Sequence, residues 1–490
     1  MTALASRTRM KNPHAPVLLP ALVILVGMLL RIALLGVDVR LHPDEALFAA
    51  QARTVSAWGD ILLRGSDLDK PPLAIYSLAA SFALLGPSEF AARLPNVFAS
   101  VLTLAVLYRL TLALSRDRVT ALLAALLLAL SAYDLTFAAT AFTDVQATLW
   151  ALAAALLAAR GRWGWAGAAS ALVVATKLNA ALALPLIVAL GLAQTARESV
   201  SPRALLPQLA RFAGALLIGL ALLALWDAAR SPQSFWALNA ARNNPGRVIR
   251  SDELVPRLET WARWLHYVTG APLLNLVLLA GAIVNLGSGW RSRTRAALCD
   301  WLIAIWAIAF LATHWLVAVN TYDRYLHPLV PFLLILAARG AVRAVRAAHV
   351  SRAGALGLLT LTLIAMSPGV VGALRGELPI GGDQGRHTGI DALADTINRE
   401  LAGAVVYENG LGWELAFYLG ESPRAQIVHT PQPEALAEEM RGRADTRYFV
   451  APSAAHAAPW LDALERDEIT ARRIQLEGSG EFALYALSAR

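Results

Sequence analysis

Charged residues are scarce in this sequence: Asp, Glu, Lys and Arg make up 16% of the 490 residues, against 57% for hydrophobic residues. A soluble globular protein has about a quarter charged residues, so this balance excludes a soluble fold for most of the chain. The apolar residues fall in runs of about 17–25 residues, the length that a helix needs to cross a bilayer. Leu and Ala dominate these runs, so we predict helical spans.

Cysteine is nearly absent as well. The only one is Cys299, which excludes an intrachain disulfide, and no Cys/His cluster has zinc spacing. We therefore predict no required metal or cofactor, and a divalent metal is not indicated. The formal net charge is +8, but the arginines cluster between apolar runs, where they set topology and contact lipid headgroups. A nucleic-acid partner is not expected.

The apolar runs predict a mainly α fold, a polytopic transmembrane bundle of about eleven spans. Arg7, Arg9 and Lys11 precede the first span, and the compact basic loops all fall on one side, which places the N-terminus in the cytoplasm and the C-terminus outside the inner (plasma) membrane. The predicted spans are Val17–Leu35, Ala91–Leu114, Val119–Leu135, Val145–Ala159, Trp163–Ala175, Ala180–Ala193, Ala213–Trp226, Ala271–Leu286, Ala297–Val317, Pro328–Ala338 and Gly354–Val371.

Two domains are expected. Residues 1–371 form the transmembrane domain, whose long first outer loop, residues 36–87, contains interfacial helices. Residues 372–490 form a small extracytoplasmic α/β domain, because short apolar strands alternate there with polar helical stretches. The expected strands are Ala404–Tyr407, Gln426–His429, Arg447–Val450 and Glu481–Ala486, and the expected helices are Leu411–Leu419, Pro433–Arg441 and Ala455–Glu465.

The first outer loop contains the residues best suited to chemistry. Asp44 and Glu45 follow the first span, and Lys70 lies further along the same loop. A carboxylate at a membrane surface can accept a proton while a nearby lysine binds an anion. Structural alternatives stay open: Asp44 can cap an interfacial helix with Glu45 in its first turn, and the Lys70 side chain can simply extend to the headgroups.

Several motifs recur in a fixed order in this loop: Pro-Asp-Glu at 43–45, Gly-Asp at 59–60, Lys-Pro-Pro-Leu at 70–73, and Gly-x-x-Glu-x-x-x-Arg-Leu-Pro at 86–95. The set resembles the first outer loop of the GT-C glycosyltransferases, nearest to the bacterial aminoarabinose lipid A transferases and relatives of protein O-mannosyltransferases. The resemblance implies an inverting transferase that moves a hexose or pentose from polyprenyl phosphate to an acceptor hydroxyl outside the membrane. The lipid A transferases have a basic residue soon after the Asp-Glu pair, whereas residues 46–48 here are Ala-Leu-Phe.

The same resemblance assigns roles to particular residues. A carboxylate activates the acceptor hydroxyl, and cations stabilise the leaving phosphate. The implied roles are catalysis for Asp44 and Glu45, donor phosphate binding for Lys70, Arg324, Tyr325 and Lys177, and a second acidic or acceptor site for Asp144.

Each of the later residues has a structural alternative. Arg324 and Tyr325 are residue types typical of the membrane interface. Asp144, after Thr143, would act as a helix N-cap, and the Lys177 side chain would extend to the headgroups. Arg242, in the second outer loop, is expected to be solvated.

Two other functions stay open. A transporter or flippase of a lipid-linked sugar predicts charges in mid-span and broken helices, whereas the candidate charges here lie at span ends and in outer loops. An inactive scaffold would use only the outer domain. The expected partners are a polyprenyl-phosphate-sugar donor, membrane lipids and an acceptor that is a lipid, polysaccharide or protein.

Overall fold

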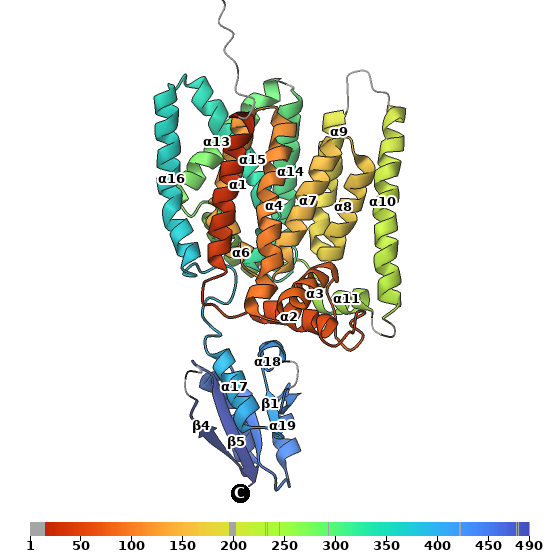
Figure 1. Cartoon of the computed structure of the whole chain (residues 1–490), viewed down its shortest axis with the longest axis vertical. Coiled ribbons are helices and arrows are strands. Elements are labelled where there is room, and N and C mark those ends of the chain that lie inside the picture. The colour runs from red at the N-terminus through yellow and green to blue at the C-terminus, as the bar shows by residue number, and fades with distance from the viewer. Residues whose placement is uncertain are drawn as a thin grey trace, which may run out of the picture.

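The computed structural model describes residues 15–195, 202–230, 232, 234–244, 246–292, 294–420, 423–476, 478 and 480–489. Arg7, Arg9 and Lys11 lie outside these ranges. Most of the chain forms an upright helical bundle (Figure 1). Its helices are α1 (Ala15–Leu34), α4 (Glu89–Ser115), α5 (Arg118–Ala129), α6 (Ala132–Ala138), α7 (Thr143–Ala159), α8 (Trp163–Thr176), the 3-10 helix η1 (Leu178–Ala183), α9 (Leu184–Thr195), α10 (Pro202–Ala228), α13 (Pro272–Ser292), α14 (Arg295–Leu316), α15 (Val330–Ala347) and α16 (Arg352–Leu374).

Every predicted span overlaps a helix of this bundle. By length and hydropathy, six of the described helices can cross a membrane, or seven if the bent pair α5 and α6 counts as one span. Others, among them α7 and α8, are shorter apolar helices. The predicted count of about eleven spans therefore stays a prediction.

The predicted third span is not one continuous helix. α5 ends at Ala129 and α6 starts at Ala132, with a bend of 57° between them. The buried guanidinium of Arg31 donates hydrogen bonds to the carbonyls of Leu128 and Ala129 at 3.3 Å, and the Ser131 hydroxyl accepts one from the amide of Asp134. These side chains supply partners for the backbone groups that the break leaves free, which is why an apolar run can bend here.

The loop helices gather at one end of the bundle, and the basic turns at 115–118 and 160–162 lie at the opposite end (Figure 1). The expected helices of the first loop are present. The loop elements are α2 (Pro43–Ser56), α3 (Leu73–Leu85), α11 (Phe235–Asn243), η2 (Ser251–Glu253), α12 (Leu254–Leu265), η3 (His266–Val268) and η4 (Asp323–Leu326).

The C-terminal part forms a five-stranded mixed sheet in the order β2-β1-β3-β5-β4, below the loop helices (Figure 1). β1 pairs in parallel with β2 and β3, and β5 pairs antiparallel with β3 and β4. All four expected strands are present, whereas α17 and β4 were not predicted. The elements are α17 (Ile390–Glu400), β1 (Val405–Glu408), α18 (Gly412–Tyr418), β2 (Gln426–His429), α19 (Pro433–Met440), β3 (Arg447–Ala451), α20 (Ala454–Arg466), β4 (Ile469–Ile474) and β5 (Ala483–Ala489).

Helix α18 attaches this domain to the first loop. The buried Arg53 of α2 donates hydrogen bonds to the carbonyls of Phe417, at 2.6 Å, and Ala416. The Tyr418 hydroxyl accepts one from the amide of Leu41 at 2.9 Å and donates one to Glu89 at the start of α4. Charged and aromatic groups therefore join the two parts at both ends of α2.

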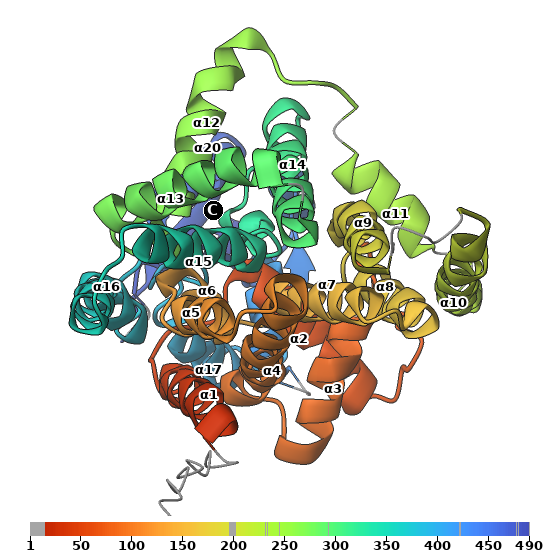
Figure 2. The same cartoon turned by 90° about the horizontal axis from the view of Figure 1, so that it is seen from above.

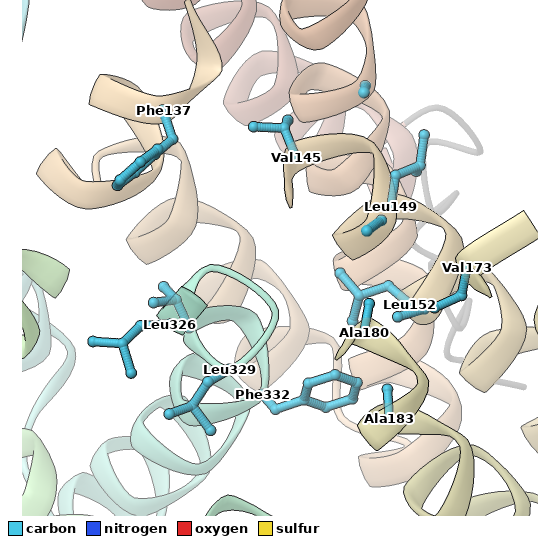
Figure 3. Packing of buried hydrophobic residues seen from close by; sticks show 14 of the residues in the cluster. Phe137, Val145, Leu149, Leu152, Val173, Ala180, Ala183, Leu326, Leu329 and Phe332 are labelled. Atoms are coloured by element: carbon cyan, nitrogen blue, oxygen red, sulfur yellow. The ribbon is translucent and has the colours of Figure 1, made fainter. Parts of the chain in front are cut away.

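A buried apolar core lies directly inside the loop end of the bundle. Figure 3 shows side chains from α6, α7, α8, η1 and α15 packed together, including Phe137, Leu149, Val173 and Phe332. Leu326 and Leu329, which flank the loop before α15, belong to the same cluster. This core fixes the loop ends of the helices from which the site is built.

Helix α10 lies at the edge of the bundle against α8 (Figure 2). Its close approach depends on Gly167 of α8, where an added Cβ would lie 2.1 Å from the carbonyl oxygen of Phe212. One turn earlier, a Cβ at Gly164 would meet no atom within 4 Å.

We expect Gly167→Ala to lower the stability of the protein in detergent by about 1–3 kcal/mol, because backbone atoms must move apart. Gly164→Ala, on the same helix, should be neutral or slightly stabilising because alanine favours helix. Thermal unfolding of the two variants beside the wild type tests this, and equal midpoints for all three would contradict it.

Candidate functional site

A cavity of about 690 Å³ opens among the loops at this end of the bundle. It is bordered by the first loop, the second loop, the start of η1 and the segment before α15. Five of the residues predicted for the site line it: Asp44, Lys70, Lys177, Arg324 and Tyr325. Trp413 of α18 also lines it, so the C-terminal domain forms part of its wall.

Asp44 occupies the first turn of α2. The N-cap is His42, whose Nδ1 accepts a hydrogen bond from the amide of Asp44 at 3.2 Å. The capping interpretation of Asp44 is therefore wrong, and its carboxylate is free to face the cavity. There it forms an ion pair with the guanidinium of Arg324. The Asp44 side chain is 37% exposed, so a ligand in the cavity can reach it.

Glu45 lies next to Asp44 but faces the other way. Its side chain is fully buried, and its carboxylate accepts hydrogen bonds from the amides of His42 at 3.0 Å and Ala141 at 2.7 Å. Burial raises the pKa of this carboxyl above its ordinary value. Glu45 does not line the cavity. The geometry therefore assigns Glu45 to holding α2 in place, and the catalytic role implied for it stays a prediction.

Arg324 is buried rather than part of an interfacial belt. Its guanidinium carbon lies 4.3 Å from the ring centroid of Tyr322 and 4.6 Å from that of Phe142. Asp323 accepts the amide of Arg324 at 2.7 Å and the amide of Gly381, in the segment before the C-terminal domain, at 2.6 Å. Two aromatic faces and a fixed backbone therefore hold the guanidinium beside Asp44.

Asp144 and Lys177 form one unit. The Lys177 ammonium lies 2.5 Å from a carboxylate oxygen of Asp144 and 4.6 Å from the ring centroid of Tyr325. The Asp144 side chain is buried, and the N-cap of its helix is Phe142. Asp144 is therefore not the N-cap, and Lys177 extends to this carboxylate instead of to headgroups. The position of Asp144 suits orientation of Lys177.

Lys70 is held by the second long loop, through Asn243 of α11. Its ammonium lies 2.8 Å from Asp69 and 3.3 Å from the side-chain oxygen of Asn243. The side-chain nitrogen of Asn243 donates a hydrogen bond to Asp69 at 3.0 Å. Next to Asn243 on α11, Arg242 pairs with Asp67 at 3.1 Å at the exposed rim. We did not predict Asp69, Asn243 or this pair, although the polar run at the end of α11 was a possible signal.

Charge in the cavity is balanced pair by pair. Each of the cations just described has a carboxylate partner of its own: Lys70 with Asp69, Lys177 with Asp144, Arg242 with Asp67 and Arg324 with Asp44. An entering anion must therefore exchange with a carboxylate. Among the described residues, no three His, Cys, Asp or Glu side chains gather as a metal site would require, and the absence of a required metal stays a prediction.

A second cavity, of about 370 Å³, lies beyond Arg324 and shares Tyr322 and Arg324 with the first. His387, in its wall, has Nδ1 2.5 Å from Asp383 and Nε2 2.9 Å from Glu414 of α18. Although burial opposes the charged ring, these two carboxylates raise the pKa of His387 to about 9. Burial and the nearby Arg324 lower the pKa of His42, on the facing wall, to about 4.

Comparison with known proteins gives a family match over part of the chain. Residues 69–226, about a third of the sequence, match the family model described as dolichyl-phosphate-mannose-protein mannosyltransferase. This segment includes Lys70, Asp144 and Lys177. No curated protein matches the chain in sequence.

Solved structures resemble the whole chain. ArnT from Cupriavidus metallidurans, bound to undecaprenyl phosphate, superimposes with a TM-score of 0.66 at 17% identity, over 97% of this chain and 98% of ArnT. The oligosaccharyltransferase of Archaeoglobus fulgidus superimposes with a TM-score of 0.56 at 14% sequence identity. The match covers 94% of this chain and 73% of the oligosaccharyltransferase. The mycobacterial arabinofuranosyltransferase AftD superimposes with a TM-score of 0.54 at 16% sequence identity. The match covers 96% of this chain and 41% of AftD. At these identities the likeness shows the fold, and it confirms the resemblance to GT-C proteins.

The His387 contacts predict a pH-dependent stability. The ordinary pKa of histidine is 6.5 and that of His387 is about 9. Between these pH values His387 therefore keeps a proton in the folded chain that it loses in the unfolded chain. The contribution of His387 to stability should therefore be complete below pH 6.5 and lost as the pH rises through 9.

Thermal unfolding in detergent from pH 6 to pH 10 measures this. The wild-type midpoint should fall across the interval relative to that of His387→Gln, which has no titrating ring. Parallel curves for the two proteins would contradict the prediction.

Proposed function

We propose that this chain, a protein with the GT-C fold, is an inverting glycosyltransferase that moves a sugar from a polyprenyl-phosphate donor to an acceptor hydroxyl. The observation that carries the proposal is the convergence of Asp44, Lys70, Lys177 and Arg324 on one cavity. These residues come from loops far apart in the sequence. A base beside several cations is the arrangement that this reaction needs.

The donor phosphate would bind among Lys70, Lys177 and Arg324. Each cation is held by a carboxylate before the donor arrives, and a phosphate oxygen offers each a charge-assisted partner in its place. Apolar side chains such as Phe48 and Leu182 line the same cavity, which suits a prenyl chain next to the phosphate. Tyr325, whose ring lies under Lys177, orients that lysine toward the phosphate.

Arg324 has a particular part in this exchange. Before the donor binds, its guanidinium holds an oxygen of Asp44. When it turns to the phosphate, that oxygen becomes free to accept a proton. Donor binding therefore prepares the base, so the acceptor is activated only when a donor is present.

The transfer step follows from this arrangement. The acceptor hydroxyl gives its proton to Asp44, and its oxygen forms a bond to the anomeric carbon of the sugar. The bond from that carbon to the phosphate oxygen breaks, and the electron pair leaves with the polyprenyl phosphate. Lys70, Lys177 and Arg324 stabilise the charge that develops there. Attack on the face opposite the leaving group inverts the anomeric centre.

We also propose that the reaction takes place on the extracytoplasmic face of the inner (plasma) membrane. The cavity lies at the loop end of the bundle, and the basic turns lie at the other end (Figure 1). Basic turns favour the cytoplasmic side. This supports an extracytoplasmic position for both the cavity and the C-terminal domain.

The alternative, a transporter or flippase of a lipid-linked sugar, has one observation in its favour. Arg31 and Asp134 form a buried ion pair beside the break between α5 and α6, and buried charges at a broken helix are typical of transporters. However, Arg31 also supplies the hydrogen bonds that the break requires, and neither residue lines either of the two large cavities. A structural role explains this pair.

Asp44→Asn should reduce transfer by roughly 100- to 10,000-fold, because the amide cannot accept the acceptor proton. The control is Asp67→Asn, which lines the same cavity but belongs to an exposed pair, and it should remain within a few-fold of the wild type. Membranes from a deletion strain, which accumulate the donor, provide the substrate, and mass spectrometry follows the release of polyprenyl phosphate. Near wild-type transfer by Asp44→Asn would refute the base assignment, and lipid movement without bond cleavage would favour the transporter.

Lys70→Gln and Arg324→Gln should each weaken the binding of undecaprenyl phosphate by about 10- to 100-fold, since each removes a hydrogen bond to a charged group. Arg247→Gln is the control, because Arg247 pairs with Glu253 outside the cavity. Titration in nanodiscs measures the dissociation constants. A loss as large in the control as in the two variants would point to a general charge effect instead.

A further inference from the structure

We infer that the second cavity receives the acceptor, and that the part of the acceptor that enters it is a neutral, hydroxyl-rich group of the saccharide type. The inference rests on the proposed function, because it takes the first cavity as the donor site. It adds a substrate class and a position for the acceptor, both of which the proposed function leaves open.

The position of the second cavity is the first argument. Arg324 and Tyr322 line both cavities, and Asp44 is bound to that guanidinium. His42 and Pro43, the residues just before Asp44, line the second cavity. An inverting transfer needs the nucleophile and the leaving phosphate on opposite faces of the sugar. Two cavities that meet at Arg324, the ion-pair partner of the base, satisfy this requirement.

An unpartnered acceptor atom is the second argument. Asp383 is 2% exposed, and it lines the second cavity. One carboxylate oxygen accepts the amide of His387 at 2.8 Å and faces its ring at 2.5 Å. The other oxygen, Oδ2, has no hydrogen-bond partner among the residues that the structure describes. A buried carboxylate oxygen without a donor is costly, and a ligand hydroxyl would supply the missing donor.

The remaining lining residues favour a neutral polyhydroxyl group. Trp264 and Tyr322 provide aromatic faces, while Gln384 and Arg386 provide polar groups. Aromatic rings pack against the C–H faces of a sugar while polar groups bind its hydroxyls. A lipid tail would leave these polar groups without partners. Two carboxylates, Asp383 and Asp323, offset two cations, His387 and Arg386, in this wall, and Arg324 is already paired with Asp44, so the lining favours a neutral group over an anion.

The C-terminal domain completes this cavity. Glu414 of α18 lies 2.9 Å from Nε2 of His387, and His387 in turn holds Asp383. The linker segment around Gly381 is also tied to the bundle, since its amide donates to Asp323 at 2.6 Å. The wall that would face the acceptor therefore depends on both domains, which gives the outer domain a part in acceptor binding.

Two adjacent residues allow a matched test. Asn320 lines the first cavity and Thr321 lines the second, and neither belongs to the site as proposed. The only native cysteine, Cys299, is buried. In Asn320→Cys and Thr321→Cys, the rate of thiol modification therefore reports the occupancy of each cavity separately. The probes are undecaprenyl phosphate, octyl glucoside below its micelle concentration, and octyl phosphate as the charged equivalent, all with the full chain in nanodiscs.

We expect undecaprenyl phosphate to slow the modification of Asn320→Cys and not that of Thr321→Cys. Octyl glucoside should slow the modification of Thr321→Cys, with octyl phosphate less effective there. Adding Trp264→Leu should raise the half-protecting concentration of octyl glucoside by about fivefold, because an aromatic face is lost. Protection of Asn320→Cys by undecaprenyl phosphate should be unchanged by Trp264→Leu.

The failures are distinguishable. If undecaprenyl phosphate protects Asn320→Cys but octyl glucoside protects neither cysteine, or both equally, the acceptor cavity is wrong and the donor site stands. If octyl phosphate protects Thr321→Cys better than octyl glucoside does, the class of acceptor is wrong. If undecaprenyl phosphate protects neither cysteine, both the proposed function and this inference fall.

Discussion

The buried carboxylate of Glu45 fixes the geometry on which the site depends. It binds the amide of His42, at the start of α2, and the amide of Ala141, just before α7. The first outer loop is thereby joined to the bundle at the residue next to Asp44. Because a buried carboxylate needs its hydrogen bonds, this contact is expensive to break. The direction in which Asp44 points is consequently set by its neighbour.

The cations of the cavity face a related constraint. A charge in a partly buried site must be paired, and each cation has its own carboxylate. The site is thus stable without a ligand, and under the proposed function a phosphate would bind by replacing existing partners. Such an exchange costs less than burying a new charge, since the desolvation of the cations has already occurred. For Arg324 this exchange would also free the oxygen of Asp44 that it holds.

Much of the fold was predictable from local patterns. Apolar runs of sufficient length identified the helices of the bundle, and alternating short segments identified four of the strands in the outer domain. The bend between α5 and α6 was missed because the two helices together pass as one apolar run, although Ser131 and Asp134 were an N-cap signal within it. It is stabilised by Arg31, which is distant in the sequence. Strand β4 was missed because it contains few apolar residues.

The sequence by itself determined that this is a helical membrane protein, and its loop motifs singled out Asp44 and Lys70, which both line the larger cavity. Only the tertiary structure decided that Glu45 turns away from the cavity, that Asp144 holds Lys177, and that Arg324 separates two cavities. Motifs report which residue types occur in order along one segment. Pairing and burial depend on which segments meet, and the loops that meet here are separated by up to several hundred residues.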